Sequence, residues 1–406
     1  MFTRNETDWK DKGRALQETR HRMYRSILEE TRLLRAFLAV RRNNGCPGID
    51  RQSIQHFREH LGIHIRELSR LLKDKRYQPL PAVRVYIPKS NGKRRPLGIP
   101  AVRDRIVQQA VLEAIQPTLE QTFSAASYGF RPGRSAGHAL AQIREYIQEG
   151  YEYVIDADIE DFFGTIDHTV LMAKIRNAIR DRDVTRLISQ FLNAGVMEEG
   201  RYRKTTTGTP QGGVISPILA NLYLTELDYC MERAGLKLVR YADDFVILCK
   251  SVNQATYAMK TLRDKLKKLK LSLSEEKTRI TSARQGFTFL GHTFWKRGNT
   301  VYTFPSDKSM SAYKDKIRHT TRRQQPKNIK MVIERLNPII RGWGNYFRNG
   351  HGKKRCQRLD EWTRMRLRAF LLKKRRVSFE AHTKYPNTFF KGLGLVFLVD
   401  LMARRP

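Results

Sequence analysis

The chain has 406 residues, enough for two or three domains with hydrophobic cores of their own. Lysine and arginine total 77 against 40 aspartates and glutamates, which gives a formal net charge of +37 at pH 7. Such an excess of positive charge is typical of proteins whose partners are polyanions, so we expect nucleic acid as the partner. A membrane-surface protein is the rival interpretation, but no apolar run approaches the ~20 residues of a membrane span, and the basic residues are spread across the motifs and not confined to one tail.

The N-terminus and the cysteines both indicate a protein of the cytoplasm. The chain begins with polar and charged residues such as Asn5, Glu6, Asp8 and Lys10, and no apolar segment of a secretory signal follows them. The four cysteines, at positions 46, 230, 249 and 356, are scattered and form no Cys-x-x-Cys pair. We therefore predict reduced thiols, no zinc site, and a cytoplasmic location.

The first 150 residues are predicted to be mostly helical, with one hairpin. Apolar residues at helical spacing indicate a basic amphipathic helix or helix pair over 14–42, and Asn43–Gly48 is a turn signal. Further along the chain the pattern predicts a helix over 53–74, a strand over 83–87, a hairpin turn over 90–93, and helices over 101–123 and 135–149. Carboxylates are densest over 152–185, whereas lysine and arginine dominate the last hundred residues.

Two adjacent carboxylates lie between two apolar segments rich in β-branched residues. Leu238–Arg240 precedes Tyr241-Ala242-Asp243-Asp244, and Phe245–Leu248 follows it. The pattern predicts two strands with Asp243 and Asp244 at the tip of the hairpin. Adjacent aspartates in a turn are most often solvated, so the tetrapeptide alone leaves a metal site and a plain turn both open.

A second acidic segment lies upstream, in the strand-like stretch 154–163. It carries Asp156 and Asp158, which two-residue alternation places on one face of a strand. Two divalent ions about 3.5–4 Å apart, held by carboxylates, are the usual equipment for in-line nucleotidyl transfer. One aspartate from this strand and two from the hairpin would supply the ligands.

These segments resemble the motifs of reverse transcriptases. Asp158–Phe163 resembles motif A, Thr207–Asn221 resembles motif B, and Tyr241–Asp244 resembles motif C, in the order and at the spacing of that family. Three more segments are similar to blocks of the group II intron branch: Arg95–Pro100 and Tyr128–Ser135 upstream, and Ile340–Phe347 in the maturase or thumb region. The resemblance to group II intron-encoded reverse transcriptase/maturases of the bacterial, endonuclease-lacking type extends from about residue 33 to the last dozen residues.

The resemblance implies which carboxylates bind metal. The ligand of motif A lies five residues before the aromatic Phe163, which selects Asp158 and leaves Asp156 as a group behind the ligands. Asp158, Asp243 and Asp244 are therefore the expected ligands of two Mg²⁺ ions, with Mn²⁺ as a substitute.

The resemblance also implies a nucleotide site. Phe163 would exclude a ribose 2′-hydroxyl, and Phe162 is then a core residue. Gln211 and Gly212 would begin a helix beside the incoming base pair, and Lys277 would protonate the leaving pyrophosphate or lie on a surface helix. The complete expected set for the nucleotide is Lys89, Arg95, Arg105, Phe163, Gln211 and Gly212.

Basic residues outside these motifs are expected to contact phosphate. Residues 353–376 carry eleven lysines and arginines against Asp360 and Glu361, which favours a helix along a nucleic-acid backbone over a merely solvated face. Trp343, Tyr346 and Phe347 are spaced as a helix core face, and His292 is interpreted as structural. The predicted nucleic-acid contacts are Arg131, Arg134, Arg364, Arg366, Arg368, Lys373 and Lys374.

The predicted fold class is α+β: right-hand polymerase fingers and palm with an antiparallel palm sheet, then an all-α thumb. The expected domains are 1–80, a basic helical extension and the start of the fingers; 81–295, fingers and palm; 296–378, thumb; and 379–406, a short extension. After the basic helix only about 30 residues remain, so no full DNA-binding and endonuclease domain is expected.

The predicted function is RNA-directed DNA synthesis from a primer 3′-hydroxyl with dNTPs. RNA template, intron RNA and a DNA primer or target are the expected partners, and splicing and mobility of the intron would depend on binding that RNA. Two alternatives stay open: a reverse transcriptase recruited to a host function such as CRISPR spacer acquisition or DNA repair, and a non-catalytic RNA-binding maturase.

Overall fold

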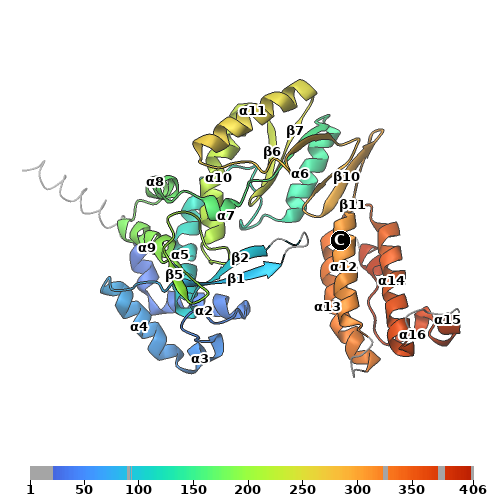
Figure 1. Ribbon diagram of the computed structural model, residues 1–406, viewed down its shortest axis with the longest axis horizontal. Coiled ribbons are helices and arrows are strands. Elements are labelled where there is room, and N and C mark those ends of the chain that lie inside the picture. Colours follow the sequence, from blue (N-terminus) through green and yellow to red (C-terminus); the bar gives the residue numbers. More distant parts are fainter. Residues whose placement is uncertain (1–21, 89–91, 93, 323–327, 374–379, 404–406) are drawn as a thin grey trace, which may run out of the picture. The chain divides into compact units, whose positions relative to one another are not determined.

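The structure is a computed structural model that describes residues 22–88, 92, 94–322, 328–373 and 380–403 (Figure 1). The chain divides into two compact units, each built from several segments. The first unit comprises Met1–Ser135, Ala157–Ile247 and Thr256–Arg279, and the second comprises Ala136–Asp156, Leu248–Ala255 and Ile280–Pro406. The expected combination of helices and sheets, an α+β fold, is confirmed.

The first unit begins with helices packed around a long central one. They are α2 (Glu30–Arg42), α3 (Ile54–Glu59), α4 (Leu61–Lys73) and α5 (Val102–Glu120). Helix α2 packs against α5 through a face that includes Leu33, Phe37 and Val40, each at most 4% exposed. The stretch predicted as one helix over 53–74 is two helices, because His60 leaves helical geometry (φ −120°, ψ 32°) between α3 and α4.

A four-stranded sheet carries the predicted hairpin of residues 83–99. Strands β1 (Ala82–Pro88) and β2 (Arg94–Ile99) pair antiparallel, with Val83 opposite Ile99 and Pro88 opposite Arg94. Strand β4 (Val196–Glu198) runs parallel to β1, and β5 (Arg201–Arg203) completes the order β2-β1-β4-β5. This confirms the predicted strand and hairpin, and it places Pro96–Gly98 beside the glycine-rich loop of motif B.

The two acidic segments belong to a second four-stranded sheet, of order β6-β7-β3-β8. The strands are β3 (Tyr153–Ala157), β6 (Lys237–Tyr241), β7 (Asp244–Cys249) and β8 (Arg279–Ser282). The predicted hairpin at Tyr241–Asp244 is therefore confirmed. The connecting helices are α7 (Phe162–Thr165), α8 (His168–Ala178), α9 (Arg182–Asn193), α10 (Ser216–Arg233) and α11 (Val252–Lys268).

Helix α9 has its N-terminus satisfied from within the chain. The carboxylate of Asp181 accepts hydrogen bonds from the backbone N–H groups of Asp183 and Val184, as an N-cap does. The same side chain, 3% exposed, accepts a 2.8 Å bond from the backbone N–H of Tyr24. The hydroxyl of Tyr24 in turn donates to the carbonyl of Leu72 in α4. A helical segment over 22–28 is thus tied to both α9 and α4.

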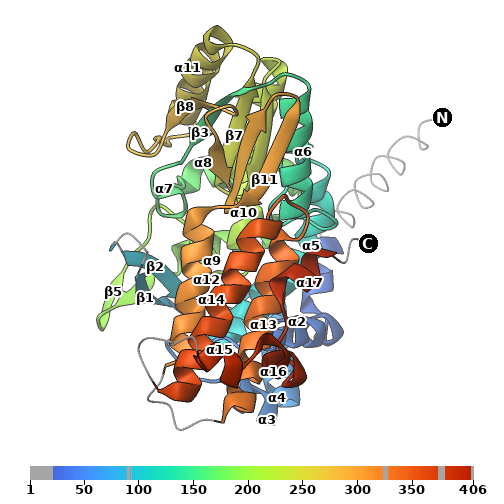
Figure 2. The same cartoon turned by 90° about the vertical axis from the view of Figure 1, so that its right-hand side faces the viewer.

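The second unit combines a small sheet with a helical bundle. Helix α6 (Ala136–Gln148) packs on the sheet β11-β10-β9, whose strands are β9 (Phe287–Phe289), β10 (His292–Arg297) and β11 (Thr300–Pro305). Helices α12 (Asp307–Thr320), α13 (Ile329–Phe347) and α14 (Lys353–Leu372) lie side by side (Figure 2). The chain ends with α15 (Glu380–Lys384), α16 (Asn387–Gly392) and α17 (Leu398–Ala403), and the bundle core contains Ile340, Leu367 and Phe390.

Three local predictions need correction. The helix expected to begin at Gln211 begins at Ser216, because Gly212 has a φ of +106° that no helix accommodates. Lys277 lies in a turn and not on a surface helix. Of the expected aromatic core face of α13, Phe347 is 4% exposed, but Tyr346 is 45% exposed and donates its hydroxyl to the carbonyl of Leu290.

Candidate active site

The hairpin tip that carries Asp243 is a tight turn with an unusual backbone conformation. Ala242 has a φ of +60°, a region that residues with a Cβ enter at a cost of roughly 1–2 kcal/mol. The carbonyl of Ala242 accepts a 2.9 Å hydrogen bond from the guanidinium of Arg240. A bond of this kind fixes the turn, so Asp243 is held in one orientation at the end of β6.

Arg240 also connects the hairpin to helix α10. Its guanidinium pairs with Asp228 (Nη2–Oδ2 2.5 Å, Nε–Oδ1 2.7 Å) and donates to Asn221 Oδ1 at 2.9 Å. The three side chains are 0% exposed. Asn221 donates onward to the carbonyl of Gly129 at 2.8 Å. A buried charge in which every nitrogen is hydrogen-bonded is rigid, and here it supports the turn that carries Asp243.

Gly129 is required where it is because the hairpin backbone lies against it. A Cβ at this position would be 2.5 Å from the backbone nitrogen of Ala242. Tyr128 N–H donates to the carbonyl of Arg240 at 2.8 Å, which brings the segment Tyr128–Ser135 alongside β6. The block resembling a group II intron motif is therefore a structural support of the hairpin.

Asp158 follows directly after β3, where the chain is pinned by a neighbouring loop. Its carbonyl accepts from Ser274 N–H at 2.8 Å, and Glu160 N–H donates to the carbonyl of Ser272 at 3.0 Å. The same loop brings the ammonium of Lys277 into an ion pair with the carboxylate of Asp158. The predicted residues Asp158 and Lys277 are thus in direct contact, although they are far apart in the sequence.

The pKa of the Asp243 carboxyl depends on its burial and on the charges of Asp158, Arg95 and Arg240. Burial raises the pKa of the Asp243 carboxyl, and the negative charge of Asp158 raises it further. The positive charge of Arg95, on β2, and that of Arg240 lower the pKa of the same carboxyl. The Asp243 carboxyl is therefore repelled by one carboxylate and attracted by two guanidinium groups.

A cavity of about 280 Å³ in the same unit brings Phe163 and Gln211 together. Its walls include Pro96–Gly98 from β2, together with Arg84 and Asp161. Phe163 is partly exposed toward this space, whereas Phe162 is 2% exposed and packs on Tyr223, as a core residue does. The cavity therefore combines an aromatic ring, a side-chain amide and cationic groups.

The motif B loop fits against its neighbours only through glycines. A Cβ on Gly208 (φ +81°) would lie 2.8 Å from the carbonyl oxygen of Phe163, and a Cβ on Gly212 would lie 2.8 Å from that of Gly98. Backbone bonds run across these contacts, from Thr209 N–H to Phe163 O (2.8 Å) and from Gly98 N–H to Gln211 O (2.7 Å). The loop therefore fixes both the backbone at Phe163 and the fingers strand β2.

Several predicted basic residues are occupied by protein acceptors. Arg105 is 8% exposed and donates to the carbonyls of Pro100 and Cys46. Arg131, 9% exposed, pairs with Glu120 and donates to two carbonyls, and Arg134 donates to the carbonyl of Ala125. None of the three lines the cavity of Phe163. Lys89, the remaining predicted nucleotide contact, lies outside the described residues.

On α14, likewise, some of the predicted basic residues are bonded to protein acceptors and others are accessible to solvent. Arg368 is 2% exposed and donates to the carbonyl of Tyr385 and to Asn387, while Arg366 donates to Thr321. Arg364 is half-buried over the ring of Phe397, and Lys373 is exposed at the helix C-terminus. Lys374 lies outside the described residues.

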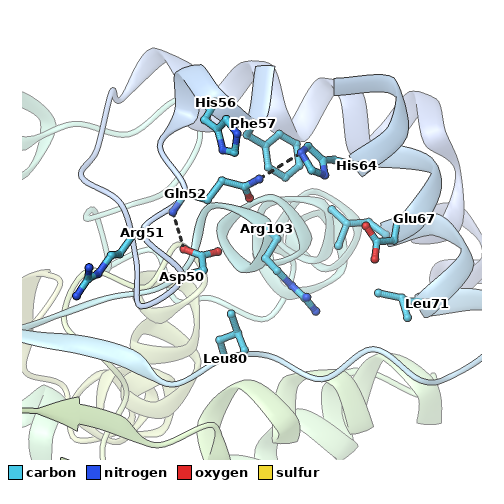
Figure 3. A pocket seen from close by; sticks show the side chains of 11 residues that line it. Asp50, Arg51, Gln52, His56, Phe57, His64, Glu67, Leu71, Leu80 and Arg103 are labelled. Carbon is cyan, nitrogen blue, oxygen red and sulfur yellow. Dashed lines mark hydrogen bonds between the residues drawn. The ribbon is translucent and has the colours of Figure 1, made fainter. Parts of the chain in front are cut away.

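A second concavity, of about 420 Å³, lies among α3, α4 and the start of α5 (Figure 3). Histidine and carboxylate side chains line it, among them His56, His64 and Glu67, and Gln52 Nε2 lies 3.2 Å from His64 Nε2. Burial lowers the pKa of His64. The negative charge of Glu67 raises the pKa of the same ring, and the positive charges of His60 and His56 lower it.

The three candidate carboxylates are of the chemical type that binds divalent ions. Asp158, Asp243 and Asp244 offer hard oxygen donors, and the mutual repulsion of Asp158 and Asp243 is relieved by a cation. In the described ranges, no three histidine, cysteine, aspartate or glutamate side chains are gathered closely enough to hold a metal ion. Lys277 supplies the positive charge beside Asp158 instead.

Sequence reasoning missed the group that supports the site. Arg240 and Asp228 are charged residues within a predicted strand and helix, and nothing in their spacing distinguishes them from surface charges. A clue was available in the composition of α10, where Asp228 and Asn221 occur among otherwise apolar buried residues such as Leu224 and Leu227.

Comparison with known proteins agrees with this geometry. Residues 87–294 match the model of the reverse transcriptase (RNA-dependent DNA polymerase) family, and residues 310–385 match the group II intron maturase-specific domain. A polymerase of the right-hand class, with fingers, palm and a helical C-terminal part, is the class that fold and site define. The chain belongs to the reverse transcriptase family and carries a group II intron maturase-specific domain.

Two curated relatives illustrate the similarity. The chain is 37% identical over 308 residues to protein YkfC of Escherichia coli, which covers 65% of this chain and 81% of that protein. It is 32% identical over 354 residues to the group II intron-encoded protein LtrA of Lactococcus lactis, which covers 70% of this chain and 58% of LtrA. Among solved structures, apo telomerase from Candida tropicalis is 14% identical and covers 77% of this chain and 59% of its own, with a TM-score of 0.48.

Proposed function

We propose that this reverse transcriptase extends a primer 3′-hydroxyl with dNTPs on an RNA template, using Asp158, Asp243 and Asp244 as ligands of two Mg²⁺ ions. The observation that carries the proposal is the placement of these carboxylates on one sheet: Asp243 and Asp244 lie where β6 turns into β7, and Asp158 lies directly after β3, the strand beside β7. Bound metal ions would lower the pKa of the primer hydroxyl and neutralise charge on the triphosphate. Mn²⁺ would substitute for Mg²⁺.

The protein groups around these carboxylates have distinct roles in the proposal. Arg95 neutralises triphosphate charge from the fingers strand, and Phe163 excludes a 2′-hydroxyl from the cavity that it lines with Gln211. Lys277, which pairs with Asp158, would donate a proton to the leaving pyrophosphate, and Asp158 would hold a metal ion when one is bound. Arg105 contributes by fixing the loop at Cys46 and not by direct contact with the nucleotide.

We further propose that the chain binds a group II intron RNA, assists its splicing, and primes cDNA synthesis at a DNA target in the cytoplasm. The maturase-specific match over 310–385 supports this, and LtrA is named as a group II intron-encoded protein. Lys373 and Arg364 on α14 would contact phosphate, with Arg366 and Arg368 positioning that helix. None of the helices within the described ranges is long and apolar enough to cross a membrane.

Primer extension by the Asp243→Asn variant tests the catalytic proposal. The substitution removes one negative charge from a site that must hold divalent ions, so extension on an annealed RNA template should fall by orders of magnitude. The matched control is Asp264→Asn, since Asp264 is an exposed carboxylate on α11. Extension by Asp243→Asn at the rate of the control would refute the assignment.

RNA binding is measured on the same variants to separate the two proposed activities. Binding of a folded group II intron transcript depends on cations and on shape, so Asp243→Asn should bind it like the wild type. A wild-type chain that binds the transcript but incorporates no dNTP would instead favour the non-catalytic maturase. Extension without selective binding of the intron would favour a reverse transcriptase recruited to a host function.

A further inference from the structure

A groove in the first unit is lined by arginines that neither the catalytic proposal nor the maturase match uses. It lies at helices α8 and α9 and encloses about 1000 Å³. Four arginines line it: Arg176, Arg180, Arg182 and Arg186, all within eleven residues of sequence and all exposed. Its floor is apolar, with Met172 6% exposed and Ile179 2% exposed.

Most of this charge is not neutralised by the protein. Arg186 approaches Asp183 at 3.7 Å, and the charge of Asp183 is shared with Lys75 at 3.0 Å. Among the residues that the structure describes, Arg176, Arg180 and Arg182 have no carboxylate within ion-pair distance. Three guanidinium groups therefore face solvent above an apolar floor, in contrast to Arg131 and Arg368, whose donors are used inside the fold.

On the face of α9 that lines the groove, the arginines are followed by neutral polar side chains. Arg182, Arg186, Ser189, Gln190 and Asn193 occur at i, i+4, i+7, i+8 and i+11, which is one face of a helix about 16 Å long at ~1.5 Å per residue. The opposite face is buried. Because Asp181 already caps the helix N-terminus, the anion-binding capacity of the groove comes from its side chains.

We propose that this groove, the α8–α9 groove, binds the sugar-phosphate backbone of structured RNA at a position separate from the palm carboxylates. Guanidinium forks match phosphate oxygens in bidentate geometry. At the other end of this face of α9 the amide nitrogens of Gln190 and Asn193 donate to the carbonyls of Tyr77 (3.4 Å) and Ser189 (2.8 Å), so a ligand would use their amide oxygens. These oxygens can accept hydrogen bonds from ribose 2′-hydroxyls, which DNA lacks, and this selects RNA over DNA. The inference rests on the proposed function only in supposing that RNA is the natural partner.

The experiment compares two triple variants of the full chain. Arg176→Gln/Arg180→Gln/Arg182→Gln removes three charges from the groove, and Lys260→Gln/Lys267→Gln/Lys268→Gln removes three exposed charges from α11. The probes are an RNA hairpin with a single-stranded tail and a DNA hairpin of the same sequence, measured by fluorescence anisotropy at several salt concentrations. Thermal unfolding verifies that each variant is folded.

The groove variant should bind the RNA hairpin at least about 10-fold more weakly than the α11 control. Its salt dependence should become shallower by about 2 units, since each lost phosphate contact removes about 0.7 on single strands. Arg176→Lys/Arg180→Lys/Arg182→Lys should restore the salt slope but only part of the affinity. If both glutamine variants lose the same affinity, the loss of net positive charge explains the effect, and the assignment of the groove as an RNA site is wrong.

A second pair of measurements tests the assignment to RNA. Gln190→Ala/Asn193→Ala should weaken RNA binding more than DNA binding, and an equal loss on both probes would overturn the preference for RNA. Primer extension on a short annealed template should be nearly unchanged in all groove variants. An inactive wild type would contradict the proposed polymerase function, whereas the groove is judged by binding alone.

Discussion

The guanidinium of Arg240 and the carboxylate of Asp228 form an ion pair in which both side chains are 0% exposed. Two of the bonds of Arg240 go to Asp228, and one goes to the carbonyl of Ala242 at the tip that presents Asp243. The pair therefore couples the stability of helix α10 to the position of a candidate metal ligand.

Breaking that pair should destabilise the protein strongly. Asp228→Asn leaves the charge of Arg240 buried without a counter-charge, which typically costs about 3–5 kcal/mol. Urea unfolding measures the loss. Glu275→Gln is the control, because it breaks the Arg263–Glu275 pair, whose side chains are 50% and 68% exposed, and should cost about 1 kcal/mol or less. Equal losses in the two variants would contradict the role given to the buried pair.

Phe163 is predicted to determine sugar selectivity. Phe163→Val enlarges the 280 Å³ cavity next to Gln211, so ribonucleotides should be incorporated at a much higher rate relative to dNTPs. Single-nucleotide incorporation with matched dNTP and rNTP gives the ratio. The neighbouring change Phe162→Leu alters a core residue and should lower stability by about 1 kcal/mol without changing that ratio. An unchanged ratio in Phe163→Val would exclude the gate.

Gly208→Ala should impair both folding and nucleotide binding. The new methyl group would lie 2.8 Å from the carbonyl oxygen of Phe163, and the φ of +81° adds strain of about 1–2 kcal/mol. Gly133→Ala has a similar φ (+70°) but open space around it, so it measures the backbone strain alone. The Gly208 variant should therefore show the larger loss of unfolding free energy and a higher KM for dNTP. Identical losses would show that the contact with Phe163 does not matter.

A pH dependence of stability is predicted from Asp360. Burial raises the pKa of this carboxyl from 3.8 to about 6, although it accepts bonds from the N–H groups of Leu398 and Val399. The folded state thus binds the proton more tightly than the unfolded state does. Stability is highest below pH 4 with respect to this group and falls by on the order of 3 kcal/mol as pH rises to about 6.

Asp360→Asn removes that titration and keeps one acceptor for the two N–H groups. Urea unfolding at pH 4, 5, 6 and 7 gives the unfolding free energy of wild type and variant. The difference between the two should change from pH 4 to about 6 and level off above that. Asp315→Asn, at an exposed site on α12, should follow the wild type at every pH. A constant difference between Asp360→Asn and the wild type from pH 4 to 7 would exclude Asp360 as the origin.

The parts of the fold that could be predicted depend on local pattern. The hairpin around Asp243 follows from two apolar runs that flank a polar turn, and its existence needed no tertiary information. The predicted start of α10 was wrong because Gly212 has a φ of +106°, outside the helical region. At this residue the backbone lies against the carbonyl of Gly98, more than a hundred residues away in sequence. Contacts of that kind leave no periodicity in the sequence.

Basic residues show the same limit. A run of arginines on α14 reads as a phosphate-facing surface, yet Arg368 is directed to the carbonyl of Tyr385 in the following segment. No motif surrounds Arg176, Arg180 and Arg182, so the sequence alone does not predict a ligand site there. Which arginines remain available to a ligand is decided by where backbone carbonyls end up after folding, and that is a property of the tertiary structure.

The hydrogen bond from the backbone of Tyr24 to Asp181 has a consequence for anyone who wishes to shorten this protein. Deleting residues through Tyr24 would strip a buried carboxylate of one of its donors and remove the hydroxyl that reaches Leu72. A shortened chain that keeps Tyr24 retains both links, whereas one that starts a few residues later exposes the apolar surface of α4 and loosens the start of α9. A truncation that keeps these two hydrogen bonds must therefore leave Tyr24 in place.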